Sequence, residues 1–284
     1  MVLSKSHWPT VPTPLLYESH CHTPLCHHAE GHPREYAAAA LQAGFKGLIV
    51  TCHCPLPDGH SDWVRMAPTE YELYLRLIDE AREEFEGRLD VRVGLESDFF
   101  PGIEPWLKEL HARHPLNHVL GSVHPQLPEY QDDFYRGDDF AFQQVYFDHL
   151  AQAAETGLFD TMSHPDLVKN LAPVAWDFAR IAPHIGNALD RIAAAGVAME
   201  LNTSGRYKAI PEMNPSASML GMMLERGIPV VIGADAHVPH RVGEGYGDAL
   251  KTLREVGYKE INVFLDRKRQ AIPIADALAS LGID

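Results

Sequence analysis

Positive charge and long apolar runs are scarce in this sequence, and each scarcity argues against a class of protein. The 24 lysine and arginine residues are outnumbered by 39 aspartate and glutamate residues, so the formal net charge is −15. Extended nucleic-acid binding needs clustered cations, which this balance disfavours. The apolar runs are far too short to cross a bilayer, and residues 1–10 contain no apolar segment that precedes a cleavage site. We therefore expect a cytoplasmic protein that binds neither a membrane nor nucleic acid.

Cysteine is also scarce, and its spacing argues against two common roles. The 4 cysteines are Cys21, Cys26, Cys52 and Cys54. No C-x-x-C pair occurs, so a structural zinc site built from all four thiolates is not expected. A chain of this length can bury a large core without disulfides. We expect buried, reduced thiols, and their closeness to the densest histidines leaves a role beside a metal open.

Short apolar runs alternate with helical segments along the whole chain. The runs cover residues 15–22, 47–54, 91–98, 118–124, 160–166, 197–204 and 229–237, with an eighth at 261–266, and helical stretches are predicted at 33–43, 68–86, 140–155, 215–226 and 244–256. Nearly continuous apolar runs are typical of parallel strands covered on both faces, and the alternation predicts βαβ units. No linker or change in composition divides the chain. The sequence predicts a single α/β domain over residues 1–284, with seven or eight units closed into a barrel.

Metal-ligand residue types recur where the predicted strands end. The first strand ends in His20-Cys21-His22 and the seventh in Asp235-Ala236-His237. Residues two apart on a strand share a face, and the C-terminal ends of barrel strands meet at one end of the barrel. We therefore expect these side chains to converge on one site. The full set of candidate ligands is His20, His22, His28, His53, Glu96, His124, His164, Asp235 and His237.

The size of this set predicts more than one ion. A catalytic zinc ion takes about three protein ligands, so nine candidates suggest about three divalent ions. Imidazole-rich sites favour zinc, iron or manganese over calcium or magnesium. The carboxylates of Glu96 and Asp235 offset part of the positive charge, and the remainder suits a phosphate dianion. We expect most of the other histidines of the chain, His118 among them, to be structural, and a role at the metals stays open for His27 and His32.

Several motifs resemble those of the polymerase-and-histidinol-phosphatase (PHP) superfamily of metallohydrolases, and within it those of the monofunctional histidinol-phosphatases. The motifs are His20-Cys21-His22-Thr23-Pro24-Leu25-Cys26 followed by His28, Gly94-Leu95-Glu96, Gly121-Ser122-Val123-His124, Ser163-His164-Pro165-Asp166-Leu167, Asn202-Thr203-Ser204-Gly205, Gly233-Ala234-Asp235-Ala236-His237 and the final Val263-Phe264-Leu265-Asp266-Arg267-Lys268-Arg269. The resemblance runs from about residue 15 to the C-terminus. It implies a distorted (β/α)7 TIM-like barrel, the PHP fold.

The resemblance also implies how the ligands divide. His20, His22, Glu96 and Asp235 would hold one ion, Glu96 would bridge it to a second ion on His124 and His164, and His28, His53 and His237 would hold a third. The family usually has Thr-Asp-His where this chain has Thr51-Cys52-His53. Because side chains alternate along a strand, Cys52 is expected on the face opposite His53, in a supporting role.

The activity that the resemblance implies is a metal-dependent phosphomonoesterase of histidine biosynthesis, which hydrolyses L-histidinol phosphate to L-histidinol and phosphate. Asp235 or His237 would handle a proton, and Arg206 and Lys208, after the sixth predicted strand, would bind the phosphate. Two alternatives stay open: a PHP phosphoesterase that acts on another small phosphate ester or a nucleotide, and a non-catalytic metal-binding protein. The sequence does not decide the oligomeric state.

Overall fold

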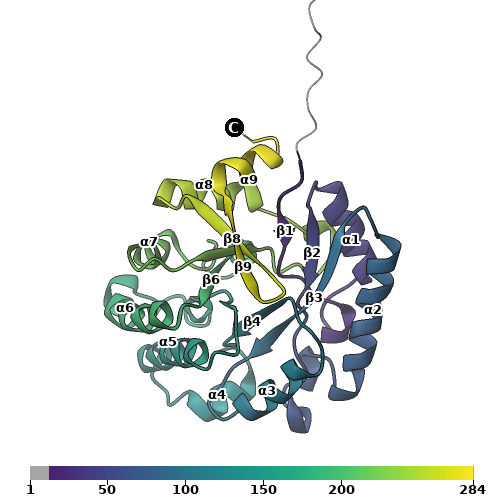
Figure 1. Cartoon of the computed structure of the whole chain (residues 1–284). Coiled ribbons are helices and arrows are strands. Elements are labelled where there is room, and N and C mark those ends of the chain that lie inside the picture. Colours follow the sequence, from purple (N-terminus) through teal and green to yellow (C-terminus); the bar gives the residue numbers. More distant parts are fainter. Residues whose placement is uncertain (1–12, 284) are drawn as a thin grey trace, which may run out of the picture.

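The computed structural model describes residues 13–283, and its centre is a barrel of parallel strands (Figure 1). Within these residues, seven strands pair in chain order, each parallel to the next. They are β1 (Tyr17–Glu18), β2 (Gly47–Val50), β3 (Asp90–Asp98), β4 (His118–Ser122), β5 (Thr161–Met162), β6 (Ala198–Asn202) and β7 (Val230–Gly233). A parallel bridge between Cys21 and Ala236 joins the segments that follow β1 and β7. The bridge closes the barrel at the C-terminal ends of its strands, so the predicted (β/α)7 barrel is confirmed.

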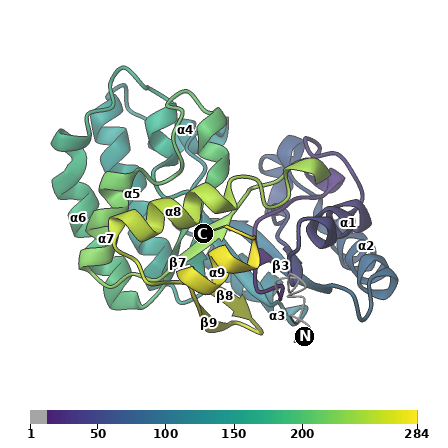
Figure 2. The same ribbon diagram turned by 90° about the horizontal axis from the view of Figure 1, so that it is seen from above.

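Helices connect successive strands and surround the barrel (Figure 2). They are α1 (Pro33–Gln42), α2 (Tyr71–Glu84), α3 (Glu104–Ala112), α4 (Pro128–Phe134), α5 (Asp139–Glu155), α6 (Phe178–Ala195), α7 (Ala217–Glu225), α8 (Tyr246–Val256) and α9 (Ile274–Ser280). The five predicted stretches correspond to α1, α2, α5, α7 and α8. The prediction contains no counterpart of α6, because Pro183 lies inside this helix and normally marks a helix end.

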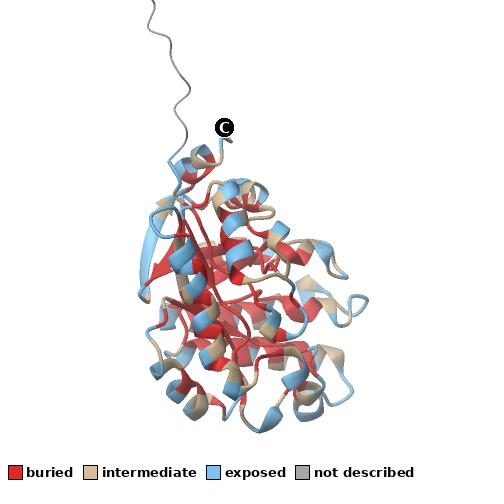
Figure 3. Ribbon diagram, turned by 90° about the vertical axis from the view of Figure 1, so that its right-hand side faces the viewer, coloured by how far each residue is buried: buried red, intermediate tan, exposed pale blue. Residues whose placement is uncertain are grey.

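The strands are buried on both faces, which explains their nearly continuous apolar sequences. All residues of β2, β4, β6 and β7 are buried, and buried residues follow the strands and the inner sides of the helices (Figure 3). One large cluster of buried apolar side chains joins the barrel to its helices. This packing holds the strand ends in place and leaves the loops that follow them free to carry polar groups.

The eighth apolar run does not join the barrel. Its strand, β8 (Glu260–Leu265), pairs antiparallel with β9 (Lys268–Pro273) in a hairpin. The two connecting residues, Asp266 and Arg267, have φ of 53° and 60°, as the hairpin turn that matches strand twist requires. Phe264 of this hairpin stacks on His118 at the start of β4, with ring centroids 5.2 Å apart. The hairpin therefore packs against the N-terminal end of the barrel, opposite the candidate ligands.

Among residues 13–283, the structure contains no helix long and apolar enough to cross a membrane. Residues 1–10, where no signal peptide is expected, lie outside the described part of the chain.

Candidate metal centre

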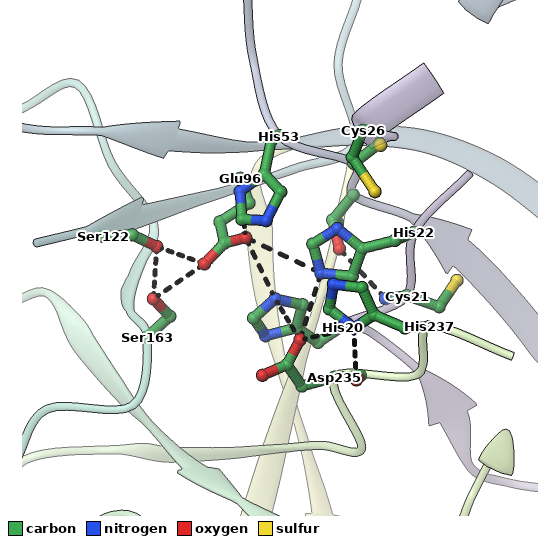
Figure 4. Close-up of polar contacts among 12 residues, drawn as sticks. His20, Cys21, His22, Cys26, His53, Glu96, Ser122, Ser163, Asp235 and His237 are labelled. Atoms are coloured by element: carbon green, nitrogen blue, oxygen red, sulfur yellow. Dashed lines mark hydrogen bonds and ion pairs between the residues drawn. The ribbon is translucent and has the colours of Figure 1, made fainter. Parts of the chain in front are cut away.

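The candidate ligands converge at the C-terminal end of the barrel, as the strand positions predict (Figure 4). Each comes from the end of a strand or from the loop that follows it. The side chains that meet there are His20, His22, His28, His53, Glu96, His124, His164, Asp235 and His237. Groups of three donor atoms close enough to share an ion include His20 with His22 and Asp235, His53 with Glu96 and His124, and His22 with His53 and His237.

Glu96 lies at the middle of the cluster, and one of its oxygens faces three imidazoles. Its Oε2 lies 2.9 Å from Nδ1 of His53, 3.4 Å from Nε2 of His20 and 3.6 Å from Nε2 of His22. A buried carboxylate surrounded by imidazoles in this way is an ordinary metal-ligand arrangement.

The other oxygen of Glu96 faces a different pair of imidazoles. Oε1 lies 3.0 Å from Nε2 of His164 and 3.4 Å from Nε2 of His124. It also accepts a hydrogen bond from the Ser122 hydroxyl at 2.6 Å, and Ser122 is hydrogen-bonded to Ser163. The two oxygens thus serve two separate groups of histidines, which is the geometry that a bridging carboxylate needs.

Asp235 adds a second carboxylate beside the first group. Its Oδ1 lies 3.1 Å from Nε2 of His22 and 3.7 Å from Nε2 of His20. Its Oδ2 accepts a hydrogen bond from the Ser204 hydroxyl at 3.0 Å. The residue has φ of 52°, a conformation that costs energy for most side chains and that occurs at functional sites.

His28 and His237 form the solvent-facing side of the cluster. Their Nε2 atoms lie 3.0 Å apart, and the ring centroids of His28 and His53 are separated by 5.4 Å. The His237 ring also stacks on His22, with centroids 3.9 Å apart. The residues of the third predicted ligand set therefore lie together, at the outer edge of the centre.

Several imidazoles are anchored through the ring nitrogen that faces away from the centre. Nδ1 of His20 lies 2.6 Å from Oε1 of Glu200, and Nδ1 of His124 lies 3.0 Å from Oδ1 of Asp98. Asp98 in turn accepts a hydrogen bond from the buried Arg65 at 2.7 Å. Such partners fix the tautomer and orientation of a histidine that binds metal through its other nitrogen.

The protein shifts the pKa values of the candidate ligands in two directions. Burial lowers the pKa of His53 to about 3 and the pKa of His237 to about 2, so both imidazoles are neutral at pH 7. Burial alone would raise the pKa of Glu96, but the neighbouring His53, His20 and His124 hold it well below its usual range. Nearby carboxylates outweigh burial and raise the pKa of His22 to about 9 and the pKa of His124 to about 10, so these two imidazoles hold protons that a bound ion would replace.

Buried polar atoms in the cluster lack the hydrogen bonds that such atoms normally make. Within residues 13–283, Nε2 of His20, Nδ1 of His53 and Oε2 of Glu96 have no hydrogen-bond partner. A buried polar atom without a partner costs about 1–3 kcal/mol, and these three atoms point at one another. Coordination of divalent ions would satisfy all three, so the residues fit a metal centre.

A cavity of about 250 Å³ opens over the cluster. Lys208 lines it together with Gln126 and Leu167. Arg206 is not among the lining residues: its Nε donates to the Thr203 carbonyl at 3.2 Å and its Nη1 lies 3.5 Å from Asp248. Of the two cations predicted to bind phosphate, the structure therefore brings only Lys208 to the cavity.

The predicted site residues do not include Asp98 and Glu200, although the strand pattern of the sequence indicates both. Asp98 lies two residues after Glu96 on β3, so the two side chains point to the same face of the sheet. Glu200 and Asn202 are likewise two residues apart on β6 and share a face. Gln126 and Leu167 carry no comparable pattern, because they lie in loops after β4 and β5.

Comparison with known proteins agrees with this geometry. The family model described as "PHP domain" matches residues 18–204, about two thirds of the chain. The chain belongs to the PHP family. A Deinococcus radiodurans protein named "Probable histidinol-phosphatase" is 39% identical over 264 residues, which cover 90% of this chain and 98% of that protein. The Bacillus subtilis "Histidinol-phosphatase" is 28% identical over 81% of this chain and 96% of its own length.

A solved PHP relative has the same fold. The structure of histidinol phosphate phosphatase from Lactococcus lactis, described as complexed with zinc, L-histidinol and phosphate, superposes with a TM-score of 0.75 at 18% identity. The match covers 89% of this chain and 98% of that one. At this identity the likeness shows the fold alone, which confirms the barrel predicted from the sequence.

Proposed function

We propose that this PHP protein is a metal-dependent histidinol-phosphatase, which hydrolyses L-histidinol phosphate to L-histidinol and phosphate in histidine biosynthesis. The observation that carries the proposal is the position of Glu96, whose two oxygens face two groups of histidines at the floor of a cavity that Lys208 also lines. The relatives from D. radiodurans and B. subtilis, which align over nearly their whole lengths, support this substrate.

The proposed ligand sets keep the division expected from the sequence, and we propose three divalent ions of zinc, iron or manganese. One ion would lie on His20, His22, Glu96 and Asp235, the second on Glu96, His124 and His164, and the third on His28, His53 and His237. When bound, such ions polarise phosphoryl oxygens and lower the pKa of a coordinated water. We propose a single domain over residues 1–284, because the segment after β7 supplies Asp235 and His237 beyond the matched region.

The chain's own residues have separate tasks in this proposal. Lys208 would bind a phosphate oxygen from the cavity wall, a task for which Arg206 is badly placed because it contacts Asp248. Asp235 and His237 both line the cavity, and one of them would take up the proton that the attacking water loses and pass it to the leaving alkoxide. Ser204 orients Asp235 by donating to Oδ2. The four cysteines are free thiols, which supports a cytoplasmic enzyme.

Phosphate release from three substrates tests the proposal: L-histidinol phosphate, a nucleoside monophosphate and a generic aryl phosphate, each with the metal-loaded protein. A pocket fitted to L-histidinol phosphate should favour it in kcat/KM by at least about a hundredfold, roughly 3 kcal/mol. Equal kcat/KM for L-histidinol phosphate and the nucleotide would favour the broader phosphoesterase alternative. No release from any of the three would favour the non-catalytic alternative.

A further inference from the structure

Two of the buried cysteines lie beside the metal centre without belonging to any of its proposed ligand sets. The Sγ atoms of Cys26 and Cys52 and a ring nitrogen of His22 all lie within 4.8 Å of one another. All three residues are completely buried, and both cysteines are free thiols. Figure 4 shows Cys26 on the side of the centre where His22 and His53 lie.

Among the described residues, no carboxylate anchors the outer ring nitrogen of His22. Nε2 of His22 faces Oδ1 of Asp235 at 3.1 Å, but its Nδ1 is buried and has no hydrogen-bond partner among residues 13–283. The matching nitrogens of His20 and His124 are anchored by Glu200 and Asp98. A histidine that binds metal almost always has a partner on its second nitrogen, so His22 lacks an expected contact.

Two donors of one residue point at the sulfur of Cys52. It accepts hydrogen bonds from both the backbone N–H and the hydroxyl of Thr23, each at 3.3 Å. Donors aimed at one sulfur and an unpartnered imidazole beside it form a pocket that suits thiolate ligands.

We propose that Cys26, Cys52 and Nδ1 of His22 form a binding site for one thiophilic divalent cation, such as Zn²⁺ or Cd²⁺. Thiolates select such ions over Mg²⁺ or Ca²⁺. On binding, each thiol releases its proton to solvent, and two thiolates neutralise the dication. Where Nε2 of His22 also holds an ion of the centre, Nδ1 releases its proton to solvent too, and the imidazolate joins the two ions. An ion held there therefore adds no positive charge beside a centre that already gathers cations.

A second donor group lies between this pocket and the cavity. Cys26 also belongs to a group with His28 and His237, whose ligand atoms likewise lie within 4.8 Å of one another. His28 and His237 line the cavity. The two donor groups share Cys26, and an ion bound to Cys26 and Cys52 would anchor His22.

Titration of the full-length, metal-stripped protein with Cd²⁺ tests the proposal, followed by the ultraviolet charge-transfer absorption of cadmium–thiolate bonds. Histidine and carboxylate ligands do not produce this band, so ions elsewhere in the centre do not interfere. The wild type should develop the band to saturation at one thiolate-bound ion per chain. Cys26→Ser and Cys52→Ser should each lose at least half of its intensity. The matched control is Cys54→Ser, because Cys54 is equally buried but belongs to none of the donor groups among residues 13–283.

A second substitution keeps the test valid if loss of Cys52 disturbs folding. Cys52→Asp retains an acceptor for both Thr23 donors while removing the sulfur, and it should lose the band to the same extent as Cys52→Ser. Absence of the band in the wild type, or an undiminished band in folded Cys26→Ser and Cys52→Asp variants, would overturn the proposal. The readout is independent of substrate, so its failure leaves the proposed phosphatase activity untouched.

Discussion

Two histidines at opposite ends of β4 show how differently the barrel uses one residue type. His118, at the start of the strand, is completely buried, hydrogen-bonds through Nε2 to the Thr161 hydroxyl at 2.9 Å and stacks on Phe264. Burial lowers its pKa to about 3. His124 follows the end of the same strand, where burial is outweighed by Asp98 and Glu96 and its pKa rises to about 10 in the absence of metal.

The contrast indicates that neighbouring charges, rather than burial, separate the proposed metal ligand His124 from the packing residue His118. Both imidazoles are nearly inaccessible to solvent, yet only His124 faces carboxylates on two sides. An ion can replace the proton that those carboxylates attract, whereas His118 has an aromatic ring and a hydroxyl as neighbours. The N-terminal end of the barrel is therefore built for stability and the C-terminal end for chemistry.

The largest expected effect comes from removing the charge of Glu96. Glu96→Gln takes away the anion between the two groups of histidines and should lower kcat by at least about a thousandfold, because metal is lost and charge repulsion rises. Metal content by elemental analysis should fall by at least one ion per chain, while circular dichroism shows an intact fold. Near-native turnover in this variant would remove Glu96 from the centre.

Replacing each β4 histidine tests the comparison directly. His124→Ala should lower kcat/KM by about a hundredfold or more with little loss of stability. His118→Ala should leave kcat/KM within about twofold but lower the free energy of unfolding by about 2–4 kcal/mol, because it leaves a cavity and an unpaired Thr161 hydroxyl. Urea unfolding and phosphate release measure the two effects, and an exchange of the two phenotypes would refute the comparison.

Glu200→Gln should have a smaller effect that acts through His20. The Glu200 carboxylate accepts from Nδ1 of His20, which leaves Nε2 free to bind metal. Its other oxygen accepts the His164 backbone N–H at 2.9 Å and the Asn202 amide at 3.0 Å, so a glutamine would keep its oxygen there and turn its NH₂ toward His20. His20 would then be protonated on Nε2, and metal affinity should fall about 10- to 100-fold in a chelator competition. Unchanged affinity would show that Glu200 does not set the tautomer.

Lys208 and Arg206 provide the smallest and most selective comparison. Lys208→Ala should raise KM about tenfold, since a hydrogen bond to a charged group contributes about 1.5 kcal/mol. Arg206→Ala serves as the matched control and should change KM by less than about twofold, because Arg206 points to Asp248. Steady-state kinetics with L-histidinol phosphate distinguish the two, and the reverse order would place Arg206 at the phosphate.

The barrel and the convergence of its candidate ligands could be predicted because both depend on strand periodicity. His20 and His22 share a face of one strand, and parallel strands bring their ends together, so distant residues such as Glu96 and Asp235 meet them. The same alternation applied to Asp98 and Glu200 would have indicated the anchoring carboxylates, which carry no motif of their own.

Other features depend on local geometry that periodicity does not describe. Arg206 and Lys208 follow β6 in and just after a short 3₁₀ helix, Thr203–Tyr207, so they do not share a direction as strand residues two apart would. The hairpin of β8 and β9 turns at Asp266-Arg267, a pair without the usual asparagine-glycine signal, so an eighth barrel strand was an equally good prediction.

The most direct test of the centre is anomalous diffraction from crystals of the metal-loaded protein, recorded at the absorption edge of the bound metal. We predict a pair of peaks on either side of the Glu96 carboxylate, each about 2.0–2.2 Å from one of its oxygens. One peak should lie near Nε2 of His20 and Nε2 of His22, and the other near His124 and His164. Saturating metal with no peak within coordination distance of either Glu96 oxygen would contradict the bridged centre.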